Sequence, residues 1–263
     1  MTLLSNSLSQ GPWLERRRPF RHVVVREVFL PAVAAAISEA ASDLIYDSGS
    51  LRHFGWYDAY ACGFQQAGEG PLQLFTSRPW HDLIARAMDV PATGHINGGL
   101  HHHPVGTASG FIHNDLNPVY FHRDPDPDEV VLPDHSRVSY TAGSVGAADA
   151  QAREVVRCTA MIYYVANPAW HIGDGGETAL YSKINQDIRY PEGKVPPISN
   201  SMLLFNCTPT SFHAFACNRR SERNTIVMWL HALPADMARR FGAESFVRFR
   251  ATPGAHSNDP GVT

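Results

Sequence analysis

From residue 97 onward the chain is a succession of short apolar runs, each bounded by turn residues. The runs are rich in β-branched and aromatic side chains, which strands favour. They are VVRCTAMIYYVA (155–166), ETALYS (177–182), SMLLFNC (201–207), FHAFAC (212–217) and NTIVMWLHA (224–232). Strands at such close spacing predict a β-sandwich or barrel. We therefore expect a mostly β fold.

Helices are expected to flank these strands. After a strand at 22–30, residues 31–45 form an alanine-rich amphipathic pattern with Pro31 in the first turn. Residues 77–89 predict a second helix, in which Ser77 can cap the first turn. Residues 236–248 predict a short third helix. The overall fold class is thus mostly β with flanking helices.

The 263 residues suit one domain, because large β-sandwiches and barrels often reach this length with flanking helices. We expect a flexible arm at 1–20, an N-terminal strand and supporting helices at 22–96, and a β core at 97–232. A C-terminal helix at 233–250 and a tail at 251–263 would follow. Residues 117–154 interrupt the core with DPDPDE and a run rich in glycine, alanine and serine. Such a long loop is functional or disordered. We weigh an active-site lid or partner-binding insertion equally against a mobile surface loop.

The composition of the chain limits the classes of binding partner that we expect. The net charge is −3, so no global basic excess indicates nucleic acid, and no apolar run reaches the length of a membrane span. The four cysteines form no CxxC pair, and no apolar signal region precedes them. We expect a reduced, cytoplasmic protein that binds neither nucleic acid nor membrane, with a homodimer as an open alternative. The 14 histidines supply many candidate ligands.

The first candidate site is the stretch FIHNDLNP, in which His113 and Asp115 lie two residues apart. On a strand, this spacing places both side chains on the same face. An imidazole and a carboxylate that share a face can chelate one divalent metal ion. Such pairs also arise by chance, so a polar strand end without chemistry is the alternative.

His213, in FHAF, is the candidate third ligand. If its strand lies beside that of His113, the three side chains form a two-histidine, one-carboxylate triad. This triad occupies one face of an octahedral Fe(II) ion and leaves the opposite positions open. A core histidine with satisfied hydrogen bonds is the alternative. Ten residues later, Arg223 begins a predicted strand, where it could form a bidentate pair with a carboxylate inside the barrel or a surface ion pair.

Together these residues resemble the prolyl 4-hydroxylase-like branch of the Fe(II)/2-oxoglutarate-dependent dioxygenases. The resemblance covers roughly residues 97–232, and more loosely 22–45. Its motifs are His113-x-Asp115, Arg157 opening RCTAMIYYVAN, GDGGETALY, SMLLFNC, His213 and Arg223-x5-Trp229. It implies a double-stranded β-helix core (jelly roll, cupin-like) with supporting helices. One departure is that residues 116–156 separate Asp115 from Arg157, where many members have a short link.

The resemblance implies that His113, Asp115 and His213 bind Fe(II). It also implies that Arg223 binds the distal carboxylate of 2-oxoglutarate, with O2 as the further cosubstrate. Three other residues have weaker matches. Tyr164 matches a tyrosine that also touches this carboxylate in some members, and Tyr163 replaces it if the match is off by one. His103, in GGLHHHPVG, lies where some members carry an aromatic residue beside the cosubstrate, and we expect it to line the pocket.

The implied reaction is oxidation of a substrate C–H bond, coupled to conversion of 2-oxoglutarate to succinate and CO2. A carboxylate at position 115 favours hydroxylation, or desaturation, cyclisation or demethylation, over halogenation. We expect a small-molecule substrate such as an amino acid or natural-product intermediate. A protein or carrier-tethered side chain is the first alternative, and a non-catalytic jelly-roll binding module is the second. The aromatic residues Trp56, Tyr57, Tyr60 and Phe64 either line the substrate pocket or belong to the core.

Overall fold

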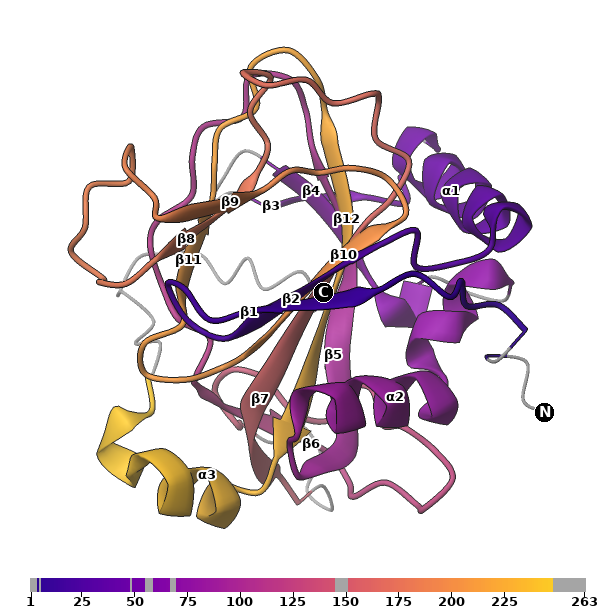
Figure 1. The fold of residues 1–263 in the computed structure, drawn as a ribbon. Helices are drawn as coiled ribbons and strands as arrows, with labels where there is room; N and C mark the ends of the chain where they lie inside the picture. Colours follow the sequence, from indigo (N-terminus) through magenta and orange to yellow (C-terminus); the bar gives the residue numbers. More distant parts are fainter. Residues whose placement is uncertain are drawn as a thin grey trace.

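The computed structural model describes residues 4, 6–47, 49–54, 59–66, 70–144 and 151–247. They form two antiparallel β-sheets, with helices packed on the outside of the larger one (Figure 1). The mostly β class predicted from the sequence is therefore confirmed. Within these residues, no helix combines the length and the hydropathy that crossing a membrane requires.

The larger sheet has nine strands among the described residues. Eight of them are hydrogen-bonded in one continuous order, and β6 (Pro118–Phe121) pairs separately with the beginning of β7. The continuous order is β1 (Trp13–Arg16), β2 (His22–Arg26), β10 (Ser201–Asn206), β7 (Arg153–Tyr164), β12 (Arg223–Ala232), β5 (Ala92–His103), β4 (Ala59–Gly63) and β3 (Arg52–Phe54). The sheet thus brings strands from both ends of the chain beside β7 and β12.

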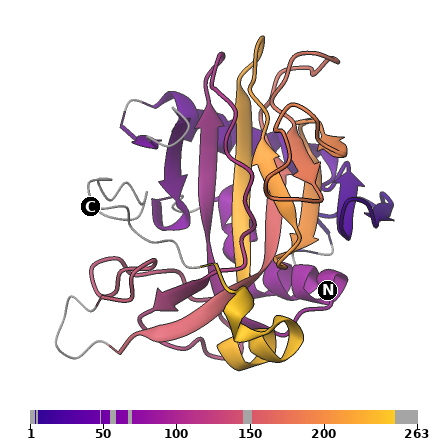
Figure 2. The ribbon, with the colours of Figure 1, turned by 90° about the vertical axis from the view of Figure 1, so that its left-hand side faces the viewer.

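The smaller sheet contains β11 (Phe212–Phe215), β8 (Thr178–Tyr181) and β9 (Gly193–Val195), in that order. In Figure 1 it lies on one side of the long strands, and the first two helices lie on the other. Figure 2 shows the long strands of the larger sheet running almost parallel to the vertical axis. The face of β7 and β12 toward the smaller sheet is therefore an internal surface, on which a site can be built.

The helices confirm the predicted segments closely. The first, α1 (Pro31–Tyr46), begins with a proline, and α2 (Arg78–Met88) begins after Ser77, whose hydroxyl accepts a hydrogen bond from the Trp80 backbone N–H. Short 3-10 helices are η1 (Phe64–Gln66), η2 (Pro71–Thr76) and η3 (Ala243–Ser245). Trp80, Ile84 and Met88 of α2 are buried in the main core. This packing covers the outer face of the larger sheet.

Two adjacent tyrosines of β7 show how the strand divides these two environments. The Tyr163 ring contacts Phe29 and Phe75 on the helical side, and its hydroxyl donates to the Asn200 side chain. The Tyr164 hydroxyl instead pairs with Thr178 of the smaller sheet at 2.7 Å. Successive strand residues point to opposite faces, so the predicted division between Tyr163 and Tyr164 is confirmed.

The structure corrects several predicted boundaries. The expected flexible arm contains strand β1, which pairs with β2 from Trp13–Val25 to Arg16–His22. The core sheet begins before residue 97, because β5 begins at Ala92 and β2 pairs with β10. The last helix, α3, spans Pro234–Phe241 and ends at Gly242, whose φ of 79° is outside the helical region. The predicted tail, 251–263, lies outside the described residues.

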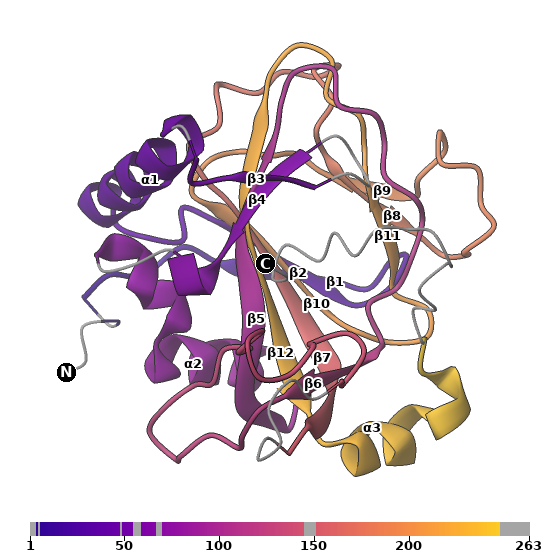
Figure 3. The same cartoon turned by 180° about the vertical axis from the view of Figure 1, so that it is seen from behind.

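Most of the predicted insertion is packed against the rest of the fold. Strand β6 pairs with β7, and Val131 exchanges main-chain hydrogen bonds with the beginning of β5. A separate apolar cluster contains Val119, Phe121, Val131, Tyr140 and Val155. Figure 3 shows this segment at the lower ends of β5, β12 and β7. Residues 145–150 lie outside the described part of the chain, but the mobile-loop interpretation is wrong for the packed residues.

Candidate metal centre

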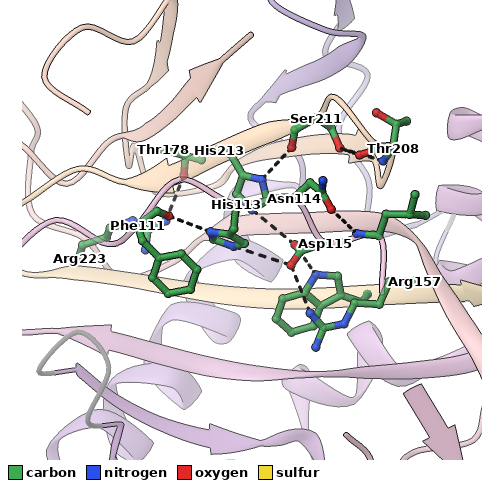
Figure 4. Close-up of polar contacts among 12 residues, drawn as sticks. Phe111, His113, Asn114, Asp115, Arg157, Thr178, Thr208, Ser211, His213 and Arg223 are labelled. Atoms are coloured by element: carbon green, nitrogen blue, oxygen red, sulfur yellow. Dashed lines mark hydrogen bonds and ion pairs between the residues drawn. The ribbon is translucent and has the colours of Figure 1, made fainter. Parts of the chain in front are cut away.

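Two distant histidines are joined by a backbone pairing. The His113 N–H donates to the His213 carbonyl at 3.1 Å, and the His213 N–H donates to the His113 carbonyl at 2.9 Å. This is the adjacency that the sequence prediction required. Neither His113 nor Asp115 lies in a regular strand, contrary to the prediction, but ligand atoms of His113, Asp115 and His213 all lie within 4.8 Å of one another. The structure therefore brings the three predicted ligands together (Figure 4).

The hydrogen bonds of both imidazoles orient a ring nitrogen toward Asp115. Nδ1 of His113 lies 2.9 Å from the Phe111 carbonyl, and Nδ1 of His213 lies 3.1 Å from the Ser211 carbonyl. A carbonyl only accepts, so each Nδ1 carries a proton, and Nε2 is the nitrogen whose lone pair can bind a metal. These Nε2 atoms lie 3.8 and 3.4 Å from Asp115 carboxylate oxygens.

The protonation states also suit a divalent cation. Burial, aided by the neighbouring His213, lowers the pKa of His113 to about 4. Burial alone would raise the pKa of Asp115, but contacts with His213, His113 and Arg157 hold it well below its usual range. At neutral pH His113 is therefore neutral and Asp115 is ionised. Two imidazoles and one carboxylate on one side of a site are the ligand set of mononuclear Fe(II) oxygenases, so these residues fit that metal.

Two side chains of the larger sheet hold the Asp115 carboxylate from behind. Arg157 Nη1 donates to one oxygen at 3.2 Å, and Trp229 Nε1 donates to the other at 2.8 Å. The Arg157 guanidinium also lies 4.0 Å from the centre of the Trp229 ring, as in a cation–π contact. Groups that orient a ligating carboxylate fix its direction and tune its basicity. The sequence reasoning quoted both residues as family motifs but gave neither a role.

Arg223 lies inside the fold, at the beginning of β12, and is only 5% exposed. Its Nη2 donates to the Thr178 hydroxyl at 3.1 Å, and the guanidinium lies over the rings of Tyr164 and Phe215. No acidic side chain in the described part of the chain forms an ion pair with it, and its Nε has no hydrogen-bond partner there. The surface-ion-pair alternative is wrong. Arg219 and Arg220, by contrast, are exposed.

Thr225 is a buried polar residue near Arg223 that was not predicted from the sequence. It pairs with Tyr164 in β7 and with His101 in β5, so it shares the internal face with Arg223 two positions earlier. Its hydroxyl is fully buried and has no hydrogen-bond partner among the described residues. Strand alternation from Arg223 could have identified it. A buried hydroxyl without a partner is rare in folded proteins and makes Thr225 a candidate ligand contact.

His103 pairs with Arg223 across β5 and β12 and is 4% exposed. Its ring stacks on Phe215 with the centroids 4.2 Å apart. Burial and the charge of Arg223 lower the pKa of His103 well below its ordinary value. A neutral imidazole therefore lies beside Arg223. His102 points to the opposite face, where Nδ1 lies 2.7 Å from the Asn224 side-chain oxygen.

The aromatic residues predicted as a group at 56–64 lie in different environments. Phe64 is buried in the main core, and the Tyr60 ring contacts His53 and His102 on the outer face of the sheet. Trp56 and Tyr57 lie outside the described residues. Beside the triad, Phe111 is 41% exposed, and its ring contacts that of His113. The His113 side of the triad thus faces the surface, whereas the Asp115 side faces the interior.

Known proteins show the same architecture. The family model for the 2OG-Fe(II) oxygenase superfamily matches residues 135–231, which include His213 and Arg223. A prolyl-4-hydroxylase from Pseudomonas putida aligns with 84% of this chain and 93% of its own, at 15% identity and a TM-score of 0.50. A Trichoplax adhaerens prolyl hydroxylase, in complex with a hypoxia inducible factor oxygen degradation domain peptide, covers 83% and 86%, at 16% identity and a TM-score of 0.53. No curated protein sequence matches the chain.

Two histidines and one carboxylate form the ligand set of non-haem iron oxygenases. The matched segment begins after His113 and Asp115, so the structure supplies independently the two ligands that lie outside it. Residues 135–231 of the chain are thus similar to the 2OG-Fe(II) oxygenase superfamily, and the structure adds a His-Asp-His triad. Fe(II) and 2-oxoglutarate are the cofactor and cosubstrate that this similarity and the His-Asp-His triad imply.

Proposed function

We propose that the protein uses Fe(II), 2-oxoglutarate and O2 to oxidise, and most simply to hydroxylate, an unactivated C–H bond of a small molecule. The observation that carries this proposal is the pairing of two features on one internal face. One is the triad of His113, Asp115 and His213. The other is Arg223, a buried cation without an acidic partner in the described part of the chain. A metal site and a carboxylate site are the two contacts that a 2-oxo dicarboxylate requires.

In this proposal His113 and His213 would hold Fe(II) through Nε2, and Asp115 would hold it through its carboxylate. When bound, Fe(II) and 2-oxoglutarate supply the oxidising chemistry, with succinate and CO2 as coproducts. The carbonyl contacts of the protein hold a proton on each Nδ1, burial keeps His113 neutral, and the neighbouring side chains keep the carboxylate ionised. Arg157 and Trp229 fix the direction of that carboxylate.

Arg223 would bind the distal carboxylate of 2-oxoglutarate. A buried charge without a counterion is costly, and a carboxylate that arrives from the ligand removes that cost while accepting hydrogen bonds. Nε of Arg223 and the Thr225 hydroxyl are two buried donors on β12 that have no partner in the described part of the chain. Tyr164 and Thr178 already form a hydrogen-bonded pair beside Arg223. We place His103 in the wall of this pocket, next to Arg223.

The core would be a double-stranded β-helix. Two antiparallel sheets facing one another across the triad support this finer description. The fold of the two prolyl hydroxylase structures supports it as well. In such a barrel the substrate would approach from the His113 side, because the Asp115 side is backed by Arg157, Trp229 and the inserted segment.

A small-molecule substrate is our first choice, and two observations favour it. The net charge of −3 gives no basis for a polyanionic partner, and residues 116–156 replace the short link found in many prolyl 4-hydroxylase-like proteins. A protein or carrier-tethered side chain is the second candidate. It is favoured by the partial exposure of Phe111 and His113 beside the triad and by the fold shared with two prolyl hydroxylases.

One assay separates these candidates. The protein is loaded with Fe(II) under air and 2-oxoglutarate, succinate is quantified, and products are screened for a mass increase of one oxygen atom across amino acids, metabolites and proline-containing peptides. Turnover confined to free metabolites supports the first choice, and turnover confined to peptides replaces it with the second. His213→Ala is the control. Succinate formation that is equal in this variant and the parent protein would contradict the proposed site.

A further inference from the structure

A buried chain of hydrogen bonds leads from the metal ligand Asp115 into the inserted segment. Arg157 Nη1 donates to Asp115, and Arg157 Nε donates to the Tyr140 hydroxyl at 3.2 Å. The same hydroxyl lies 2.9 Å from Nε2 of His231, and Nδ1 of His231 lies 2.9 Å from the His95 carbonyl. Tyr140 is 1% exposed and His231 is fully buried.

The direction of every hydrogen bond in this chain follows from its last acceptor. The His95 carbonyl only accepts, so Nδ1 of His231 carries the proton and Nε2 is an acceptor. Burial lowers the pKa of His231 well below its ordinary value, so the ring is neutral. The Tyr140 hydroxyl therefore donates to His231, and its oxygen is left to accept from Arg157. Each group has one permitted role, which fixes the guanidinium in one orientation.

Tyr140 is held in place by main-chain hydrogen bonds and by apolar packing. Its carbonyl accepts a hydrogen bond from the Tyr120 N–H, and its ring packs edge-on against Phe121. Its apolar neighbours include Val131, which is bonded to the beginning of β5. These contacts place the described part of the insertion behind Asp115, on the side opposite the partly exposed His113. This is not the position of a cover over the site.

We propose that Tyr140 is a positioning residue of the metal centre and that the inserted segment supports the centre from behind. Tyr140 fixes Arg157, and Arg157 fixes the Asp115 carboxylate. This inference rests on the proposed role of Asp115 as a ligand. It assigns to residues 118–140 a function in metal affinity, in place of a lid or a partner-binding loop.

The test is a titration of the metal-free protein with Mn²⁺. Binding is measured by electron paramagnetic resonance, as the decrease of the signal from free Mn²⁺. Tyr140→Phe removes the hydroxyl and keeps the ring. We expect the dissociation constant for Mn²⁺ to rise on the order of 10-fold, the lower end of the range for groups that orient metal ligands. The matched control is Tyr163→Phe, which removes a buried tyrosine hydroxyl from the opposite face of β7 and should leave Mn²⁺ affinity unchanged.

A double substitution tests the route through Arg157. Arg157→Lys retains a cation for Asp115 but lacks the Nε–H that meets Tyr140. If Tyr140 acts through Arg157, adding Tyr140→Phe to Arg157→Lys produces no further loss of Mn²⁺ affinity. Equal losses in both backgrounds would overturn the proposed route. Melting temperatures, measured in parallel, separate a loss of fold from a loss of ligand orientation.

His231→Asn disrupts the series of hydrogen bonds at the end far from Asp115. This variant replaces Tyr140→Phe as the test if Tyr140→Phe does not fold. Asparagine can still donate to the His95 carbonyl, but it does not reach Tyr140, so Mn²⁺ affinity should fall. Unchanged affinity in both His231→Asn and Tyr140→Phe would overturn the inference. In that case, loss of Mn²⁺ binding in Asp115→Ala would still support the proposed metal site, and only the role of Tyr140 would be rejected. Parent protein that binds no Mn²⁺ would overturn both.

Discussion

His113 and His213, one hundred positions apart, are held side by side by two reciprocal main-chain hydrogen bonds of 3.1 and 2.9 Å. The backbone thus sets the spacing of the two imidazoles before any metal binds. Each ring is then oriented by a carbonyl two residues earlier in the chain. Such prior organisation lowers the conformational cost of binding a ligand. The predictions below test what this geometry implies for metal, cosubstrate and proton binding.

Asp115→Ala should abolish Mn²⁺ or Fe(II) binding, because it removes the only carboxylate of the triad. It should also lower the free energy of unfolding by about 3–5 kcal/mol, because it leaves buried Arg157 without its partner. Metal titration and urea unfolding measure the two effects. The control is Asp174→Ala, which removes another buried aspartate and should retain metal binding. Hydroxylation and metal binding that both survive in Asp115→Ala would show that the ligand assignment is wrong.

Arg223→Leu should raise the concentration of 2-oxoglutarate needed for half-maximal succinate formation by roughly 10- to 100-fold. The reason is that a hydrogen bond to a charged group contributes about 1.5–3 kcal/mol. Initial rates across a 2-oxoglutarate series measure this change. Arg219→Leu, in the exposed turn before β12, is the control and should behave like the parent protein. An unchanged 2-oxoglutarate dependence in Arg223→Leu would remove this residue from the site.

Tyr164→Phe and Tyr163→Phe form a matched pair on one strand. The Tyr164 hydroxyl faces Thr178 and Arg223, whereas the Tyr163 hydroxyl bonds Asn200 beneath the helices. We expect Tyr164→Phe alone to weaken 2-oxoglutarate binding, by about 5-fold for the loss of one hydrogen bond near 1 kcal/mol. Anaerobic calorimetry with Mn²⁺ in the site measures the affinity. Equal effects of the two substitutions would argue against contact between Tyr164 and the cosubstrate.

The metal-free protein should lose stability as the pH falls from about 6.5 toward 4. In this window the unfolded chain protonates His113, whereas the folded protein, in which burial lowers that pKa to about 4, does not. Because the unfolded state binds more protons, its free energy falls relative to that of the folded state. The contribution of His113 is about 3 kcal/mol, at 1.36 kcal/mol for each pH unit.

Urea unfolding of the parent protein and of His113→Gln, at pH 7 and at pH 4.5, isolates this contribution. The variant should show a smaller loss of stability on acidification, because glutamine does not titrate. Other buried histidines, such as His101 and His231, also have lowered pKa values, so both proteins should retain some acid sensitivity. Identical losses in the two proteins would show that His113 is not the group responsible.

The local features of the site could be predicted from the sequence. His113 and Asp115 lie two residues apart and do bring their ligand atoms together, and Tyr163 and Tyr164 do point in opposite directions. The helices at Pro31 and Arg78 begin where their prolines predicted. These features depend on backbone periodicity and on side chains within one strand or turn. The boundaries were less certain, because β1 forms only by pairing with β2, and α3 ends where Gly242 leaves the helical region.

By itself, the sequence determined which side chains were available, which of them share a strand face, and which family they resemble. The tertiary structure alone decided that His213 lies against His113, that Thr225 is buried beside Arg223, and that Tyr140 reaches Arg157. The physical reason is the range of the interactions. Strand periodicity acts over two or three residues, whereas these contacts join segments that only the sheet pairing and the packing of the insertion bring together.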